Sequence, residues 1–223
     1  MNIPHSTAAI ILAAGSSSRM GSGRHKLLLP LDGHPVLVHV IDAALTSQAR
    51  PIIIVLGHEA EQVHAHITSY TSHPDITIVE NDKYLRGMST SLHLGVELLI
   101  SKGYKKDVSP SEVDSALIVL GDQPMITSKI IDTLIAIYRA TGKHIVAPLY
   151  DGKRGNPVLF DVSLFPELLE VTGDEGGRTV LERHPQELEL VEMSDALANY
   201  DIDTWEAYQR ALEVWEYRKS EKI

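Results

Sequence analysis

The chain has 223 residues, no cysteine and a formal net charge of −10 at pH 7. This length fits one α/β domain, so we expect a single domain over residues 1–223. The absence of cysteine excludes disulfides, iron–sulfur ligation and a thiol nucleophile. The negative charge argues against nucleic acid or an anionic membrane as partner, and no apolar run is long enough to span a bilayer. A cytoplasmic protein is expected.

Apolar runs typical of buried parallel strands alternate with stretches of helical spacing. The expected strands are Ala9–Leu12, Ile52–Leu56, Ile76–Val79 and Ala116–Leu120, and then the weaker Ile145–Pro148, Pro157–Phe160 and Leu188–Val191. The expected helices are Pro35–Leu45, Glu59–Ile67, Ser89–Ile100, Ile130–Ala140, Thr179–His184 and Trp205–Tyr217. Lys102–Ser115 is expected to be a loop. The alternation predicts an α/β fold with a Rossmann-like, mainly parallel sheet and helices on both faces.

The first expected strand runs into a segment of small residues, from Leu12 to Gly21, and Lys26 follows it. Small residues at the carboxyl end of a strand let backbone N–H groups approach a phosphate, and Arg19 and Lys26 supply cations for its oxygens. The spacing matches neither the Walker A loop nor the dinucleotide fingerprint. The plainer alternative is a flexible surface turn with incidental cations.

Asp122 follows an apolar strand by one glycine, in Gly121-Asp122-Gln123-Pro124. Its carboxylate should therefore emerge at the carboxyl edge of the sheet, where open α/β folds bind ligands. Mg²⁺ typically takes one or two protein carboxylates together with phosphate oxygens and water, so Asp122 is a candidate Mg²⁺ ligand. The alternative is an aspartate that merely forms a turn or caps a helix ahead of Pro124.

Asp201 and Asp203 are two residues apart, and an extended backbone would place both carboxylates on one face. Asp203 also fits the N-cap of a helix beginning at Trp205, with Glu206 reaching back to it. The eleven histidines, His64 and His66 among them, lack zinc-binding spacing and are expected on the solvated surface.

These segments resemble the molybdenum cofactor nucleotidyltransferases, and specifically their cytidylyltransferase branch, within the MobA-like NTP-transferase superfamily. The loop L-A-A-G-x-S-x-R-M-G with its following lysine and the G-D-Q-P segment carry the resemblance. Segments at 87–92, 154–160, 173–178 and 201–204 continue it, in family order, over nearly the whole chain. The resemblance implies the nucleotide-diphospho-sugar transferase fold, with a nucleotide-binding half at about 1–125 and an acceptor-binding half at about 126–218.

The resemblance also implies an Mg²⁺-dependent transfer of CMP from CTP to molybdopterin-bound molybdenum cofactor, with release of pyrophosphate. Arg19, Lys26 and Asp122 would be the catalytic residues. The nucleotide would contact Leu12, Ala13, Ala14, Gly15, Arg19, Lys26, Gly87 and Ser89. The acceptor would contact Asn156, Asp174 and Arg178. Asp122 would hold the metal together with Asp201 or Asp203, and the choice between these two stays open.

Two positions bear on how far the resemblance extends. Ala14 favours the cytidylyl branch, because guanylyl relatives usually have a second glycine there. Trp205 departs from the family, in which Pro-Glu-Asp often follows the threonine. Asp174 fits an ordinary helix N-cap as well as an acceptor contact.

Three other functions remain open. One is a nucleotidyltransferase that uses GTP. Another is a sugar-phosphate or polyol-phosphate nucleotidyltransferase on the same fold, against which Gln123-Pro124 and the segment 173–178 argue. The third is a non-catalytic carrier or insertion chaperone that delivers molybdenum cofactor to a client molybdoenzyme. Such a carrier would not need both Asp122 and Lys26, and this chain has both.

Overall fold

The structure, a computed structural model, describes residues 6–21, 23–101 and 113–221. The strands are β1 Ser6–Ala13, β2 Pro30–Leu31, β3 His34–Pro35, β4 Ile52–Leu56, β5 Ile76–Glu80, β6 Val113–Leu120, β7 Ile145–Tyr150, β8 Lys153–Arg154, β9 Val158–Asp161 and β10 Leu188–Met193. The α-helices are α1 Val36–Thr46, α2 Ala60–His66, α3 Met88–Ile100, α4 Ser128–Thr141, α5 Phe165–Leu168, α6 Arg178–Arg183 and α7 Trp205–Glu221. In this part of the chain, no helix combines the length and apolar character that a bilayer span requires.

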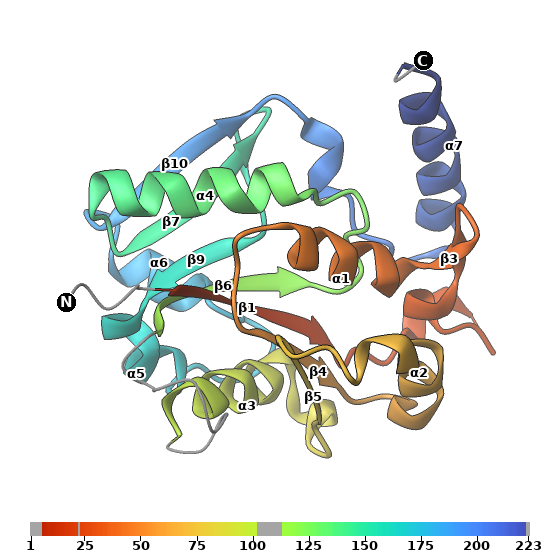
Figure 1. Cartoon of the computed structure of the whole chain (residues 1–223), viewed down its shortest axis with the longest axis horizontal. Helices are drawn as coiled ribbons and strands as arrows, with labels where there is room; N and C mark the ends of the chain where they lie inside the picture. Colours follow the sequence, from red (N-terminus) through yellow and green to blue (C-terminus); the bar gives the residue numbers. More distant parts are fainter. Residues whose placement is uncertain (1–5, 22, 102–112, 222–223) are drawn as a thin grey trace.

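One main sheet forms in the order β10-β7-β9-β6-β1-β4-β5, and β8 pairs with β7 (Figure 1). Strand β1 lies between β4 and β6 and is parallel to both. Only β9, of the strands on this path, runs antiparallel to its neighbours, β6 and β7. The expected mainly parallel α/β sheet is confirmed.

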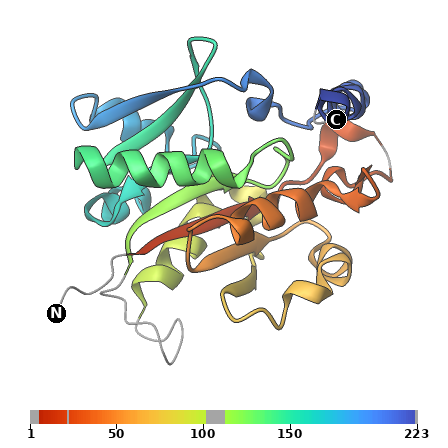
Figure 2. The same ribbon diagram turned by 45° about the horizontal axis from the view of Figure 1, so that its top comes forward.

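Helices cover both faces of the sheet, and β1 is therefore buried on both sides. Alternate residues of β1 point to opposite faces. Ala9, Ile11 and Ala13 join the cluster under α1 and α4, whereas Ala8, Ile10 and Leu12 join the cluster on the side of α3, α5 and α6. Figure 2 shows α1 and α4 lying along the same face.

The prediction of a loop over Lys102–Ser115 is wrong at its C-terminal end, because β6 already begins at Val113. Ser115 pairs with Thr7 of β1, and the two hydroxyls share a hydrogen bond of 2.8 Å. That bond satisfies two buried polar side chains, so the strand tolerates residues that its sequence pattern disfavours. Residues 102–112 lie outside the described part of the chain.

Helix α7 stands apart from the two layers of helices (Figure 1). Tyr208 and Ala211 of α7 belong to a third apolar cluster with Met20, Val36 and Ile202. The cluster therefore joins the segment that follows β1 to the segment that precedes α7. Residues from the two ends of the chain are thereby brought together.

Gly95 allows α3 to approach β1 closely. A Cβ atom at Gly95 would lie 2.5 Å from Cγ2 of Ile10, which is fully buried. We expect Gly95→Ala to lower the free energy of unfolding by up to about 2 kcal/mol, since overpacking costs about 1–3 kcal/mol and the gain in helix propensity offsets about 1 kcal/mol. Urea unfolding measures this change.

The matched control is the same substitution in an Ile10→Ala background, in which Cγ2 is absent. Ile10→Ala alone should cost about 2–5 kcal/mol. Gly95→Ala should then add nothing or become stabilising. Equal costs of Gly95→Ala in the two backgrounds would contradict the close contact.

Candidate active site

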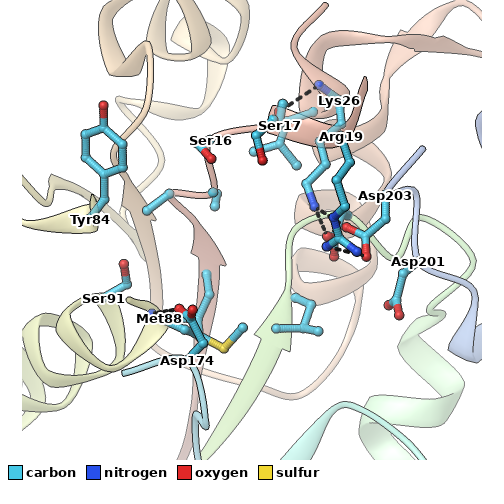
Figure 3. Close-up of a pocket in the computed structure, with 18 of the residues that line it drawn as sticks. Ser16, Ser17, Arg19, Lys26, Tyr84, Met88, Ser91, Asp174, Asp201 and Asp203 are labelled. Carbon is cyan, nitrogen blue, oxygen red and sulfur yellow. Dashed lines mark hydrogen bonds and ion pairs between the residues drawn. The ribbon is translucent and has the colours of Figure 1, made fainter. Parts of the chain in front are cut away.

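A cavity of about 570 Å³ opens at the carboxyl ends of β1 and β6 (Figure 3). One wall is the segment that follows β1, here called the N-terminal loop and comprising residues 14–21 and 23–26. The opposite wall comes from the segment around the start of α3. The floor carries carboxylates that follow β6 and precede α7. The cavity is lined by Leu12, Ala13, Ala14, Gly15, Ser16, Ser17, Ser18, Arg19, Lys26, Leu27, Tyr84, Leu85, Gly87, Met88, Ser91, Leu120, Asp122, Asp174, Asp201 and Asp203.

The N-terminal loop turns back on itself beside the cavity. Ser17 has the left-handed backbone conformation, with φ 53°, and Gly21 has φ 84°. The Ser17 hydroxyl accepts a hydrogen bond from the backbone N–H of Lys26 at 3.1 Å and so closes the turn. Met20 anchors the loop in the third apolar cluster. This leaves Arg19 and Lys26 to reach into the cavity (Figure 3).

Lys26 joins two carboxylates from distant parts of the chain. Its ammonium donates to Asp122 and, at 2.8 Å, to Oδ1 of Asp203. Arg19 contacts the other oxygen of Asp203 at 2.9 Å (Figure 3). Burial opposes the charge of Lys26, but the charges and hydrogen bonds of the two aspartates outweigh it and raise the pKa of the ammonium. Burial likewise opposes ionisation of Asp203, and its hydrogen bond with Lys26 and the charges of Lys26 and Arg19 lower its pKa.

Asp201 lies in a different environment from Asp203. The amide Nε2 of the buried Gln123 donates to Asp201 at 2.5 Å. Burial, followed by the charge of Asp122, raises the pKa of Asp201 to about 6. The backbone N–H of Ile202, which lies between Asp201 and Asp203, donates to the carbonyl of Asp122 at 3.0 Å. This hydrogen bond fixes the segment that carries Asp201 and Asp203 next to Asp122. Asp203 and Asp122 thus share Lys26, and Asp203 also contacts Arg19, whereas Asp201 accepts a hydrogen bond from Gln123.

The carboxylates of the cavity offer oxygen ligands for a divalent cation. Oδ1 of Asp122 is buried and has no hydrogen-bond partner within the described residues, so it is an acceptor without a ligand. Across residues 6–21, 23–101 and 113–221, no group of three or more His, Cys, Asp or Glu side chains is placed to hold a metal ion. An Mg²⁺ ion that takes one or two carboxylates and completes its shell with phosphate and water fits these residues.

The wall opposite Lys26 is built around the start of α3. Gly87 has φ 108°, and a Cβ there would lie 2.6 Å from the carbonyl of Gly173. The N–H of Ser89 donates to that carbonyl at 2.9 Å. The N–H of Met88 donates to Asp174 at 3.0 Å (Figure 3). The segment around Gly173 therefore satisfies the free N–H groups at the helix start.

Three of the predicted site residues are not among those that line the cavity. Ser89 is buried and makes the backbone contact just described. The backbone N–H of Asn156 donates to the side chain of Asn199 at 3.3 Å. Arg178 is exposed and pairs with Glu182 at 2.9 Å, one turn along α6. The other predicted site residues do line the cavity: Leu12, Ala13, Ala14, Gly15, Arg19, Lys26, Gly87, Asp122, Asp174, Asp201 and Asp203.

Two capping expectations are wrong. The side chain of Thr204, and not that of Asp203, accepts the hydrogen bond from Ala207 N–H at the start of α7. Asp203 is instead engaged by Lys26 and Arg19, whose charges hold it more strongly than a neutral N–H would. Asp174 caps α3 across the cavity and not its own helix, because α6 begins only at Arg178.

The expectation of surface histidines holds for His64 and His66 and is wrong for His25. His25 is 6% exposed and stacks on His58, with ring centroids 5.7 Å apart. Its Nε2 lies 3.2 Å from the carbonyl of His58. Burial lowers the pKa of His25.

Several cavity residues on the α3 side are not among the site residues predicted from the sequence motifs. Tyr84 and Leu85 lie in a short 3₁₀ helix before Gly87, and Ser91 lies one turn into α3. The Ser91 hydroxyl accepts from the amide of Asn81 at 2.9 Å. A search at i+4 from Gly87 would have identified Ser91, because this spacing returns to the same helix face. Tyr84 and Leu85 carry no such signal.

The fold and the cavity together define a nucleotidyltransferase of the NTP-transferase superfamily. Residues 9–188 match the family described as the MobA-like NTP transferase domain, and the chain belongs to that family.

Two curated relatives differ in how much of their length the chain covers. The chain is similar to the nicotine blue oxidoreductase of Paenarthrobacter nicotinovorans, with 28% identity over 91% of this chain and 95% of the relative. It is 29% identical to the bifunctional protein GlmU of Burkholderia orbicola, over 84% of this chain. It spans only 36% of GlmU.

Among solved structures, the chain resembles Rv0371c from Mycobacterium tuberculosis H37Rv. The TM-score is 0.77 and the identity 26%, and the alignment covers 94% of this chain and 99% of that one. A second structure of Rv0371c, in complex with manganese, gives a TM-score of 0.71 at 25% identity, with 94% and 98% covered.

The environment of Asp201 predicts a pH-dependent stability in metal-free protein. The folded-state pKa of about 6 lies above the ordinary value of 3.8 for this carboxyl, so the group stabilises the fold at low pH, and that stability is lost as the pH rises through 6. Asp201→Asn should therefore be more stable than wild type at pH 8 and about equal to it at pH 4. Because the residue is partly exposed, solvent screening limits the gain to about 1 kcal/mol.

Urea unfolding at both pH values, in the presence of a chelator, measures this difference. Asp82→Asn, at an exposed residue that does not line the cavity, is the matched control. A stability difference between Asp201→Asn and wild type that is the same at pH 4 and pH 8 would contradict the raised pKa.

Proposed function

We propose that the protein is an Mg²⁺-dependent nucleotidyltransferase that joins a nucleoside monophosphate to a phosphate-bearing acceptor and releases pyrophosphate. The observation that carries the proposal is the group formed by Lys26, Asp122, Asp203 and Arg19 at the carboxyl edge of a parallel sheet. Ligands bind at this edge in open α/β folds. The buried, unpartnered oxygen of Asp122 supports a metal ligand there.

In this proposal an acceptor phosphate oxygen attacks the α-phosphorus of the NTP, and the bond to the β-phosphate oxygen breaks. Backbone N–H groups of the N-terminal loop orient the triphosphate, and Arg19 and Lys26 neutralise the charge that develops on the leaving pyrophosphate. Asp122 and Asp203 would hold Mg²⁺, which would supply positive charge to stabilise the phosphate oxygens. Asp201, held by Gln123, is the third carboxylate of the cavity floor. The manganese complex of Rv0371c supports a divalent cation in this family.

The finer proposal takes CTP as donor and molybdopterin-bound molybdenum cofactor as acceptor. It rests on Ala14 in the loop, on G-D-Q-P and on the segment 173–178. Asp174 would stand at the acceptor side of the cavity, next to Met88. Asn156 and Arg178 lie outside the cavity lining and would contact only an acceptor that extends beyond it. A client molybdoenzyme would receive the product.

Two relatives favour other functions. The similarity to GlmU, over 84% of this chain and 36% of GlmU, fits the alternative of a sugar-phosphate nucleotidyltransferase on the same fold. The similarity to nicotine blue oxidoreductase supports a redox reaction instead. Oxidation of NADH or NADPH in the presence of a dye, with no pyrophosphate released from any NTP, would favour the redox function.

The donor specificity can be tested by thermal shift with each of the four NTPs and Mg²⁺. CTP should raise Tm most, because Ala14 marks the cytidylyl branch. A ligand at a hundred times its Kd stabilises by about 2.7 kcal/mol, which for a chain of this length corresponds to about 5 to 10 °C. A larger shift with GTP would overturn the assignment of CTP and leave the class of reaction standing.

The role of Asp122 can be tested by Asp122→Asn. The amide keeps the size of the side chain but not the charge that a metal requires, so pyrophosphate release should fall by more than about 100-fold while Tm without ligand stays close to wild type. Asp82→Asn is the matched exposed control and should keep full activity. Equal release from Asp122→Asn and wild type would remove Asp122 from the mechanism.

A further inference from the structure

The side of the N-terminal loop that faces away from the cavity is fixed to α7. Gly21 has φ 84° and Gly23 has φ 75°, so the backbone here has conformations that glycine alone adopts readily. Met20 is 1% exposed and packs in the third apolar cluster. The loop therefore depends on side-chain anchors on this side to keep its shape.

Arg24 makes the outermost of these anchors. Its guanidinium carbon lies 4.0 Å from the centroid of the Trp205 ring, which is cation–π geometry. Trp205 is itself fixed, because its ring packs against Tyr208 at a centroid distance of 5.1 Å. The Tyr208 hydroxyl donates to the carbonyl of Pro30 at 2.5 Å. The indole is thus a rigid platform for the arginine.

Trp205 follows Asp203 by only two residues and begins α7. Three side-chain contacts therefore connect the N-terminal loop with the same short segment: Arg19 and Lys26 with Asp203 at 2.9 and 2.8 Å on the cavity side, and Arg24 with Trp205 on the far side. Arg24 does not line the main cavity. Trp205 is also the position at which this sequence departs from the resembling family.

We propose that Arg24 is a positioning residue whose contact with Trp205 clamps the N-terminal loop to the segment that carries Asp203. The clamp keeps Arg19 and Lys26 at a fixed distance from the carboxylates that would hold the metal, so it prearranges the site for a triphosphate. This consequence for ligand binding rests on the proposed function. The clamp itself does not, because it is a contact of the ligand-free protein.

The clamp is tested first by hydrogen exchange of the amides of the N-terminal loop in ligand-free protein. A cation–π contact of this kind is worth about a two- to fivefold change in an equilibrium constant. Arg24→Ala should therefore speed exchange in the loop about two- to fivefold, and Arg24→Lys, which keeps the cation, should restore part of the protection. Arg210→Ala removes an exposed arginine of α7 as the matched control and should change nothing.

The role of Trp205 as the partner of Arg24 is tested by Trp205→Leu. If that variant does not fold, Trp205→Phe, which keeps an aromatic face, replaces it. Arg24→Ala should have no further effect on loop exchange in the Trp205→Leu background. Unchanged exchange in Arg24→Ala, or full additivity of the two substitutions, would overturn the clamp.

The second arm measures the Kd of Mg²⁺-tripolyphosphate and of each Mg²⁺-NTP by calorimetry. Arg24→Ala should raise the Kd about two- to fivefold, and Arg24→Lys should raise it less. Faster loop exchange with an unchanged Kd would overturn the positioning role. If wild type binds none of these probes, the proposed function fails, and the exchange experiment decides on the clamp alone.

Discussion

The parallel pairing of β1 with β6 is the constraint on which the rest of the molecule depends. Leu12 lies opposite Leu120 in this pairing, and the N–H of Gly121 donates to the carbonyl of Leu12 at 2.9 Å. Both strands therefore end at the same level. The N-terminal loop and Asp122 emerge side by side, although about a hundred residues separate them. Since β1 is central and buried on both faces, this register is strongly fixed.

The ion pairs of Lys26 then close the site over this edge. The ammonium contacts Asp122 and Asp203, which come from the middle and the end of the chain. A buried cation is stable only when charges and hydrogen bonds offset its desolvation, and here two carboxylates do so. Loss of Lys26 would leave the two carboxylates without the cation that they share. The triphosphate of the proposed reaction would have to compete with these carboxylates for Lys26.

The sequence predicts the sheet well because its strands are continuous β-branched runs, which few other structures accommodate. It predicts the positions of Asp122 and the N-terminal loop for the same reason, since strand ends fix them. It fails at the start of β6, where the hydroxyls of Ser115 and Thr7 pair across two strands in place of apolar packing. It also fails for the cap of α7 and for His25, because contacts between distant segments decide those side chains and local spacing carries no record of them.

The charge of the cavity argues for a cation brought in with the substrate. Among the described residues that line it, four carboxylates face two cations, Arg19 and Lys26. The formal excess is two negative charges, within a chain that is itself negative by ten. A free triphosphate would be repelled from such a site. A complex of triphosphate with a divalent cation brings positive charge, which offsets the negative charge of Asp122 and Asp203. The same carboxylates that would repel the nucleotide alone therefore favour the nucleotide that carries its metal.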